Sequence, residues 1–270
     1  MEQEARTRFV SDHRRVIAII VGVLLVSCAF TAGLWRYVSN ERKFDPGDTL
    51  THSNVTKSFV EKTGIAIIGD SWIKPELASV ISSYLATNLN RTYEAQCLGH
   101  PGGKSRQIYR NLTKEWSTIL TNEVMKYCVV IVGVNDCGGH IGADFYTHHV
   151  LVISQLLLKS GITPVIVDVP DFDIAHMDYS NLGSRFKRPL YRFLFDGGKE
   201  NVISDYRSKL HQSLRTANLD KVVIVVPFDS FIDAYSNHKE LYRNASHLNV
   251  LGTKELARHI AKVIVASEQR

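Results

Sequence analysis

The stretch AIIGDSW, residues 66 to 72, decides how the rest of the sequence is interpreted. A short apolar run, residues 65 to 68, ends at Gly69, Asp70 and Ser71. The run is too short for a helix and rich in isoleucine, which indicates a buried β-strand. In a parallel sheet, ligands bind at the carboxyl ends of the strands, where such polar residues lie. Ser71 is therefore either an ordinary turn residue or a nucleophile held at the end of a strand.

Strand-like and helix-like stretches alternate through the remainder of the chain. Apolar runs predict further strands at residues 129–132, 165–169 and 222–226, with a weaker candidate at 93–98. Helices are predicted at residues 75–89, 107–125, 145–159, 205–217 and 250–267. Because the runs are continuously apolar, they indicate a parallel sheet that is covered on both faces. The predicted fold class is α/β, a three-layer α/β/α flavodoxin-like fold with a central parallel sheet of about five strands.

The composition is that of a globular protein with a buried core. Apolar residues make up 44% and charged residues 22% of the 270 residues, which suits a single domain over residues 63–270. The formal net charge is +5, with 32 Lys and Arg against 27 Asp and Glu, scattered along the chain. A nucleic-acid-binding domain would carry a dense basic stripe, so no nucleic-acid partner is expected.

The N-terminal segment is apolar enough to cross a membrane. Residues 16 to 34 contain no charged side chain, and at about 1.5 Å rise per residue they just span a hydrocarbon core of about 30 Å. We predict a cytoplasmic tail at 1–15, a transmembrane helix at 16–35 and a polar tether at 36–62. The slight excess of basic residues before the span favours an extracytoplasmic domain, periplasmic or on the outer face of the inner membrane in a Gram-negative cell. A cleaved lipoprotein signal is the rival interpretation, because LVSC at residues 25 to 28 resembles a cleavage box.

Three further blocks of polar residues follow predicted strands or precede the last helix. They are CLGHPGGKS at residues 97 to 105, GVND at 133 to 136 and NASHLN at 244 to 249. Together with GDS at residues 69 to 71, and in this order, they resemble the four blocks of the SGNH (GDSL-type) hydrolases. Those blocks contribute a serine, a glycine, an asparagine and a histidine. The resemblance spans residues 64 to 264 and implies an esterase that needs no cofactor.

The resemblance implies a role for one residue of each block. Ser71 would be the nucleophile and His247 its base, because a serine hydroxyl does not attack an ester unaided. The N–H groups of Ser71 and Gly102 and the side-chain amide of Asn135 would hold the oxyanion of the tetrahedral intermediate. Gly103 is the alternative to Gly102, since either glycine could adopt a positive φ and bring its N–H close to the ligand.

One position departs from the pattern of the family. The residue three before the histidine is normally an aspartate that orients the imidazole, and here it is Asn244. Asparagine can accept the Nδ1 proton but carries no charge, and a comparable Asp-to-Asn change in a serine protease costs about 10⁴ in turnover. Three interpretations follow. Asn244 is the third catalytic residue at reduced activity, an acid such as Asp229 or Asp233 orients the ring, or the domain is catalytically degenerate and binds carbohydrate.

Other candidate residues have plainer explanations. Asp173 and His176 repeat the Asp-x-x-His spacing but follow the fourth predicted strand, which indicates a surface loop. The remaining histidines lack a zinc-binding spacing, so no metal is expected. Asp70 is either a turn residue that caps the next helix or a group in contact with the substrate. Cys97 and Cys137 are both expected near the catalytic edge, where they could form a disulfide.

The substrate is expected to contact residues 171–198, the segment that least resembles the family. Basic and aromatic residues alternate there, among them Arg185 and Tyr191. One interpretation is a groove in which Arg185 and Tyr191 bind an anionic or sugar polymer. The second is an amphipathic helix with inward-facing aromatic rings, and the third is contact with anionic lipid headgroups.

The expected function is that of a membrane-anchored serine esterase or O-acyltransferase. It would act on O-acyl groups, above all O-acetyl, of a cell-envelope or exported polysaccharide, and water or a sugar hydroxyl would take the acyl group from Ser71. The expected partners are an acylated carbohydrate, the lipid bilayer around the N-terminal helix, and envelope-polysaccharide machinery. A lysophospholipase or thioesterase is the alternative enzyme, for which a more apolar groove than FKRPLYRFLF, residues 186 to 195, is expected.

Overall fold

The computed structural model describes residues 2–45, 63–177, 182–232 and 234–269, which belong to two units, Met1–Lys43 and Phe44–Arg270. The first unit is helix α1, Glu2–Glu41. Its segment Ile19–Glu41, with a mean hydropathy of 1.9, is long and apolar enough to cross a membrane. A signal sequence has the same length and composition. The helix extends beyond the predicted span of 16–35 at both ends, and tether residues 46–62 lie outside the described residues.

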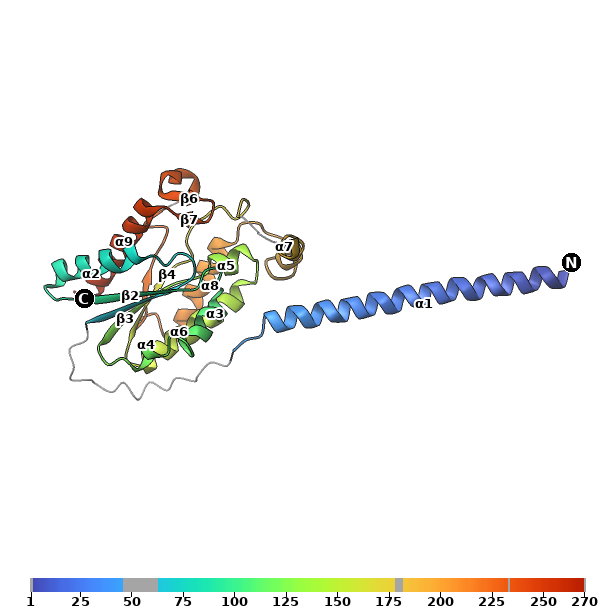
Figure 1. Cartoon of the computed structure of the whole chain (residues 1–270), viewed down its shortest axis with the longest axis horizontal. Helices are drawn as coiled ribbons and strands as arrows, with labels where there is room; N and C mark the ends of the chain where they lie inside the picture. The colour runs from blue at the N-terminus through green and yellow to red at the C-terminus, as the bar shows by residue number, and fades with distance from the viewer. Residues whose placement is uncertain (1, 46–62, 178–181, 233, 270) are drawn as a thin grey trace. The chain divides into compact units, whose positions relative to one another are not determined.

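The second unit is a three-layer α/β/α domain around a parallel sheet (Figure 1). In spatial order the five strands are β2 (Glu94–Gly99), β1 (Gly64–Gly69), β3 (Met125–Ile131), β4 (Thr163–Val167) and β5 (Ile224–Val226). The order 2-1-3-4-5 is that of flavodoxin-like sheets, in which ligands bind beyond the carboxyl ends of the strands. The predicted fold class is confirmed, and so is the weaker strand candidate at 93–98.

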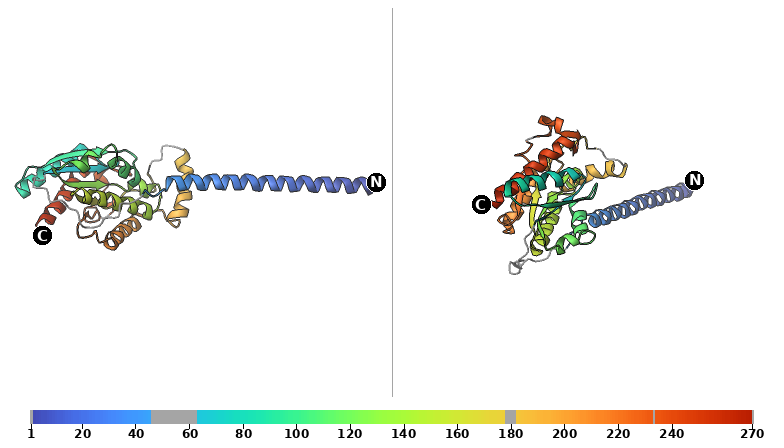
Figure 2. Two further views of the ribbon diagram at one scale, coloured as in Figure 1. Left: turned by 90° about the horizontal axis from the view of Figure 1, so that it is seen from below. Right: turned by 60° about the vertical axis from the view of Figure 1, so that its left-hand side comes forward.

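Helices cover both faces of the sheet, as Figures 1 and 2 show. Helices α2 (Pro75–Leu89) and α9 (Val250–Glu268) pack together on one face. The other face carries α3 (Ser105–Leu112), α6 (Ala143–Lys159) and α8 (Ile203–Thr216). The shorter elements are α4 (Thr118–Thr121), α5 (Val134–Gly138), α7 (Leu182–Phe195), two 3₁₀ turns at Tyr235–Asn237 and Lys239–Leu241, and the antiparallel pair β6 (Tyr242–Asn244) and β7 (His247–Leu248).

The hydrophobic core brings the ends of β1 and β3 together beneath the site. Every residue of β1 is buried, because a parallel sheet with helices on both faces has no exposed face. Gly69 ends this strand, and a Cβ added there would lie 1.9 Å from the carbonyl oxygen of Ile131 in β3. Only glycine allows this close approach. Asp70 and Ser71 therefore leave the sheet directly beside the end of β3.

One predicted helix is wrong in extent. The prediction of a helix over 107–125 corresponds to α3 and α4 with an irregular segment between them. The carbonyl of Asn111 accepts the N–H groups of both Lys114 and Trp116, which closes a turn at the end of α3. Met125, expected at the end of a helix, begins β3 instead. The other four predicted helices are confirmed to within two residues at each end.

Candidate active site

Ser71 lies in a tight turn between β1 and α2 that is built by Asp70. The Oδ1 atom of Asp70 accepts the backbone N–H of Trp72 at 3.0 Å, which closes the turn around Ser71. The carboxyl group is almost fully buried, and this burial raises the pKa of Asp70 to about 7. Its other oxygen accepts a hydrogen bond from the amide of Asn135. Asp70 thus forms the turn, while its expected contact with the substrate stays a prediction.

The hydroxyl of Ser71 contacts the imidazole of His247. The Oγ atom of Ser71 lies 2.7 Å from Nε2 of His247, a normal hydrogen-bond distance between residues 176 positions apart. Burial lowers the pKa of His247, and the nearby charges of Arg243 and Lys74 lower it further. A neutral imidazole can accept a proton from a hydroxyl, whereas an imidazolium cannot. The pair therefore has the distance and the protonation state of a nucleophile and its base.

The orientation of His247 is set by two neutral groups instead of a carboxylate. Its Nδ1 atom lies 3.1 Å from Oδ1 of Asn244 and 3.1 Å from Oγ of Ser246. The same Oδ1 accepts the backbone N–H of Ser246 at 3.1 Å. Because a backbone N–H requires an acceptor, this bond holds the amide with its oxygen toward the ring and its NH₂ group away. Nδ1 then carries the proton, and Nε2 is left free to accept one from Ser71.

The indole of Trp72 connects the first and last blocks. Its Nε1 donates to the carbonyl oxygen of Ser246 at 2.9 Å, and its side chain is 4% exposed. Nothing in the sequence suggested a role for Trp72 or Ser246 beyond their adjacency to Ser71 and His247. That adjacency was the available signal, since a neighbour of a reactive residue is the one most able to position it.

Two backbone N–H groups in the first two blocks are free to receive an oxyanion. Within the part of the chain that the structure describes, the N–H groups of Ser71 and Gly102 form no hydrogen bond. Gly102 has φ of 75°, the left-handed region that favours glycine. The N–H of Gly103 is already bonded to the carbonyl oxygen of His100 at 2.8 Å. The geometry therefore favours Gly102 over Gly103 as the second donor.

Asn135 holds three blocks together. Its Nδ2 atom donates to Oδ2 of Asp70 at 3.2 Å and to the carbonyl oxygen of Gly103 at 3.1 Å. Its neighbour Asp136 is fully buried and accepts both the N–H and the hydroxyl of Ser105, at 2.9 and 2.6 Å. The amide of Asn135 is thus fixed at the site, and donation to an oxyanion requires one of its two present bonds to be shared.

A cavity of about 330 Å³ opens over the hydroxyl and the imidazole. Its lining residues are Asp70, Ser71, Ile73, Lys74, Pro75, Cys97, Gly99, Pro101, Arg243 and His247. The lining comes from the β1–α2 turn, the end of β2 and the β6–β7 pair. A cavity of this size suits a small ligand group, and it offers few apolar side chains to a long acyl chain.

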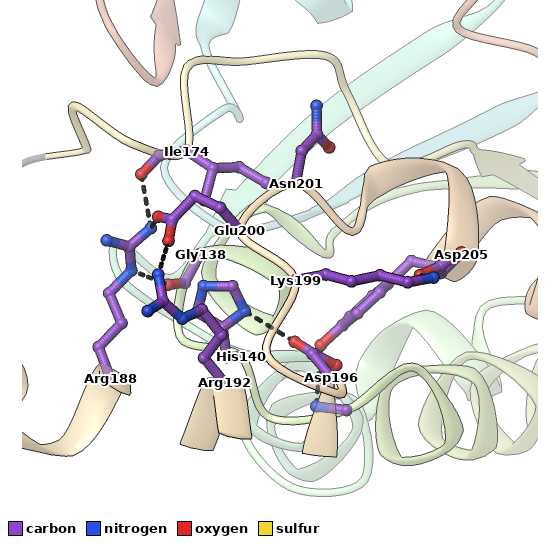
Figure 3. Close-up of polar contacts among 12 residues, drawn as sticks. Gly138, His140, Ile174, Arg188, Arg192, Asp196, Lys199, Glu200, Asn201 and Asp205 are labelled. Carbon is purple, nitrogen blue, oxygen red and sulfur yellow. Dashed lines mark hydrogen bonds and ion pairs between the residues drawn. The ribbon is translucent and has the colours of Figure 1, made fainter. Parts of the chain in front are cut away.

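Within the described part of residues 171–198, Tyr191 does not have the predicted place in a substrate groove. Tyr191 is fully buried and packs edge-on against Phe195, so its ring cannot stack on a sugar. Figure 3 shows Arg188 and Arg192 of α7 directed at the carboxylate of Glu200. Here the amphipathic-helix interpretation holds for Tyr191, because the ring packs inward and the basic groups are paired. The side chain of Arg185 lies outside the described residues, and its role stays a prediction.

The other sequence candidates lie elsewhere or make no contact with the imidazole. No contact joins the exposed Asp229 to His247 in the described part of the chain, and Asp233 lies outside it. Asp173 and His176 do pair, at 3.0 Å, on an exposed loop. The predicted disulfide is wrong, because Cys97 and Cys137 are free thiols. Among the described residues, no cluster of three or more His, Cys, Asp or Glu side chains could hold a metal ion.

Comparison with solved structures identifies proteins of the same fold. An acetyl xylan esterase matches with a TM-score of 0.54 and 18% identity, over 74% of this chain and 99% of that chain. A lipase/acylhydrolase from Enterococcus faecalis matches with a TM-score of 0.53 and 16% identity, over 76% of this chain and 96% of that chain. A GDSL-like lipase from Bacteroides thetaiotaomicron matches with a TM-score of 0.52 and 11% identity, over 76% of this chain and 89% of that chain. No protein-family model and no curated protein matches the sequence. At these identities the likeness establishes the SGNH/GDSL hydrolase fold over most of the chain.

Proposed function

We propose that the protein is a membrane-anchored serine esterase or O-acyltransferase that acts on O-acyl groups, above all O-acetyl, of a cell-envelope or exported polysaccharide. The observation that carries the proposal is the 2.7 Å distance between Ser71 Oγ and His247 Nε2 at the mouth of a cavity. A module that only binds carbohydrate has no need of a hydroxyl and a neutral imidazole at hydrogen-bond distance. The geometry therefore supports the enzyme over the degenerate binding domain.

In the first half of the reaction, Ser71 takes the acyl group. Its Oγ attacks the ester carbonyl carbon while Nε2 of His247 accepts the hydroxyl proton. The N–H groups of Ser71 and Gly102, with the amide of Asn135, stabilise the negative oxygen of the tetrahedral intermediate. The intermediate collapses, the bond to the sugar oxygen breaks, and His247 returns the proton to that oxygen. The deacylated sugar departs, and Ser71 carries the acyl group as an ester.

In the second half, an acceptor hydroxyl removes the acyl group from Ser71. His247 takes a proton from water or from a sugar hydroxyl while the oxygen of that acceptor attacks the acyl-serine carbonyl. The bond between the acyl carbon and Ser71 Oγ then breaks, His247 returns the proton to Oγ, and the acid or the acylated sugar leaves. Hydrolysis and transfer use the same residues and differ only in the acceptor. Asn244 and Ser246 position the imidazole in both halves, but neither supplies a charge to stabilise the imidazolium.

The size of the cavity and the similar structures support a small acyl group. The cavity of about 330 Å³ includes the charged side chains Lys74 and Arg243 in its lining, which suits a short acyl group better than a fatty-acyl chain. One of the proteins with this fold is named an acetyl xylan esterase, an enzyme of polysaccharide acetyl esters. Because two other proteins with this fold are named lipases, a lysophospholipase or thioesterase is the competing proposal.

The apolar segment of α1 supports anchoring in a lipid bilayer. We propose a single membrane span with the N-terminus in the cytoplasm and the domain at residues 63–270 on the extracytoplasmic side. Residues 36–62 would then connect the bilayer to the domain. A substrate in the cell envelope fits this placement.

The enzyme is tested by covalent labelling of the full chain, purified in detergent. We expect a fluorophosphonate probe to modify the native protein and p-nitrophenyl acetate to be hydrolysed, with both signals lost in Ser71→Ala. Ser79→Ala is the matched control, because its exposed hydroxyl on α2 donates to the carbonyl oxygen of Glu76 within the same helix. Labelling that persists in Ser71→Ala, or no labelling of the native protein at high probe concentration, would refute the proposal. Release of acetate from acetylated glycans, compared with release of fatty acid from lysophospholipid, then identifies the substrate class.

A further inference from the structure

Two cationic side chains from distant parts of the chain line the cavity above Ser71. Lys74 precedes helix α2, and Arg243 belongs to strand β6, immediately before Asn244. Lys74 is half-buried and Arg243 is exposed. The fold thus brings two positive charges to the lining of the cavity that contains the reactive pair, although the two residues are 169 positions apart.

These two charges have no anionic partner in the part of the chain that the structure describes. Neither Lys74 nor Arg243 forms an ion pair there, whereas Arg188, Arg192 and Arg258 each pair with a glutamate. The one acidic residue in the lining is Asp70, whose carboxyl group is buried and bonded to Trp72 and Asn135. The cavity therefore has a net positive charge that the protein does not neutralise.

We propose that Lys74 and Arg243 form a subsite for an anionic group of the substrate next to the scissile ester, so that the preferred substrate is an O-acetylated acidic glycan with a sugar carboxylate. The inference rests on the proposed function and gives it a substrate class. The guanidinium of Arg243 can bind a planar carboxylate with two parallel hydrogen bonds, and the ammonium of Lys74 adds a point charge. That both charges lie close to the imidazole is supported by their effect on the pKa of His247.

A carboxylate-bearing glycan fits this cavity better than an anionic lipid. A lysophospholipid would bring a phosphate to the cations but would also require an extended apolar surface for its chain. The apolar part of the lining consists of Ile73, Pro75, Cys97 and Pro101, beside the charged Lys74 and Arg243, around a volume of about 330 Å³. Hydrolysis of lysophosphatidylglycerol in preference to an acetylated polyuronate would overturn the proposal.

The first test compares two esters of closely similar shape, one with a carboxylate and one with a neutral carboxamide. With the full chain in detergent, kcat/KM is measured for 3-acetoxybenzoate and for 3-acetoxybenzamide at a pH well above the pKa of His247. The expected ratio favours the carboxylate by roughly tenfold, the effect of one charge-assisted hydrogen bond. The ratio should fall toward one in Lys74→Gln and in Arg243→Gln, and below one in Arg243→Glu. Lys209→Gln, which removes an exposed charge from α8 outside the cavity, should leave the ratio unchanged.

The second test requires no turnover. Binding of an acetylated oligogalacturonate to the Ser71→Ala variant is compared by calorimetry with binding of the same oligosaccharide after reduction of its carboxylates. Tighter binding of the acidic form, lost in Ser71→Ala combined with Arg243→Glu, would support the subsite. Equal binding of both forms would overturn it, even if both benzoate-type esters are hydrolysed. Failure of the proposed function has a different signature, because neither ester would then be hydrolysed while the binding comparison still reports on the subsite.

Discussion

Asn244 occupies the position at which an aspartate would hold a negative charge beside the imidazole of His247. An amide there is harmful when its NH₂ group faces the ring, because the ring then holds its proton on the wrong nitrogen. In this protein the backbone N–H of Ser246 bonds to Oδ1 of Asn244, so the amide oxygen faces Nδ1 of His247. The hydroxyl of Ser246 provides a second acceptor at the same distance. The tautomer is therefore secured without a carboxylate, and only the charge is missing.

The first prediction at the residue scale concerns that missing charge. We expect Asn244→Asp to raise kcat for p-nitrophenyl acetate about tenfold, because a carboxylate stabilises the imidazolium by about one pKa unit. The pKa of His247 lies below its ordinary value, and activity is lost as pH falls through that pKa because the base becomes protonated. The added charge should raise this pKa, so the acid limb of the pH–rate profile should move to higher pH.

The control for this prediction is Asn218→Asp, which makes the same change in charge in the turn after α8, outside the site. It should move neither kcat nor the acid limb. An unshifted acid limb in Asn244→Asp would show that Asn244 does not position His247.

Ser246→Ala keeps the backbone bond to Asn244 and should lower kcat more than it changes KM, since it removes one acceptor of the Nδ1 proton.

Helix α7 is the element whose role the sequence pattern left most open. Its alternating basic and aromatic residues fit a groove, an amphipathic helix or a lipid contact equally well, because each requires the same residue types. The structure separates these possibilities through partners that lie outside the helix. Arg188 and Arg192 reach Glu200, Arg188 also donates to the carbonyl oxygens of Gly138 and Ile174, and Asp196 bonds to the buried His140 (Figure 3).

The prediction at this scale is that Glu200 stabilises α7 and takes no part in the reaction. In Glu200→Gln, amide hydrogen exchange across Leu182–Phe195 should be about fivefold faster, since a partly exposed ion pair contributes roughly 1 kcal/mol. Hydrolysis of p-nitrophenyl acetate should not change, because none of the α7 side chains that the structure describes, residues 187–195, lines the cavity over Ser71. Glu255→Gln, which breaks the Arg258 pair on α9, is the matched control and should leave exchange in α7 unaltered. Loss of ester hydrolysis in Glu200→Gln would contradict this prediction and indicate that α7 contributes to the substrate site.

At the scale of the whole molecule, the chain consists of a long apolar helix and an α/β unit with its own core. The α/β unit, Phe44–Arg270, contains the five-stranded parallel sheet and the residues of the candidate site. We predict that the chain without residues 1–43 is soluble without detergent and hydrolyses p-nitrophenyl acetate as the full chain does. The full chain should sediment with membranes and resist extraction at pH 11, because an apolar span of 23 residues remains in the bilayer.

A cleaved signal would give a different result. The mature protein would then lack the apolar segment, and mass spectrometry of the purified chain would find a new N-terminus at or before Cys28. An intact N-terminus together with extraction by carbonate would contradict the membrane anchor, while leaving the esterase proposal untouched.

The sequence by itself determined the alternation of strands and helices, the parallel sheet and the four blocks at its carboxyl edge. These features depend on local patterns, since burial on both faces requires continuous apolar runs and strand ends present polar residues at one edge. It also placed Ser71, Asn135 and His247 at that edge. Only the tertiary structure decided that Ser246 and Asn244 share the Nδ1 proton, that Lys74 and Arg243 face one cavity, and that Tyr191 is buried. These facts depend on distances between side chains far apart in the sequence. Loop conformations and packing determine those distances jointly, so no local sequence pattern contains them.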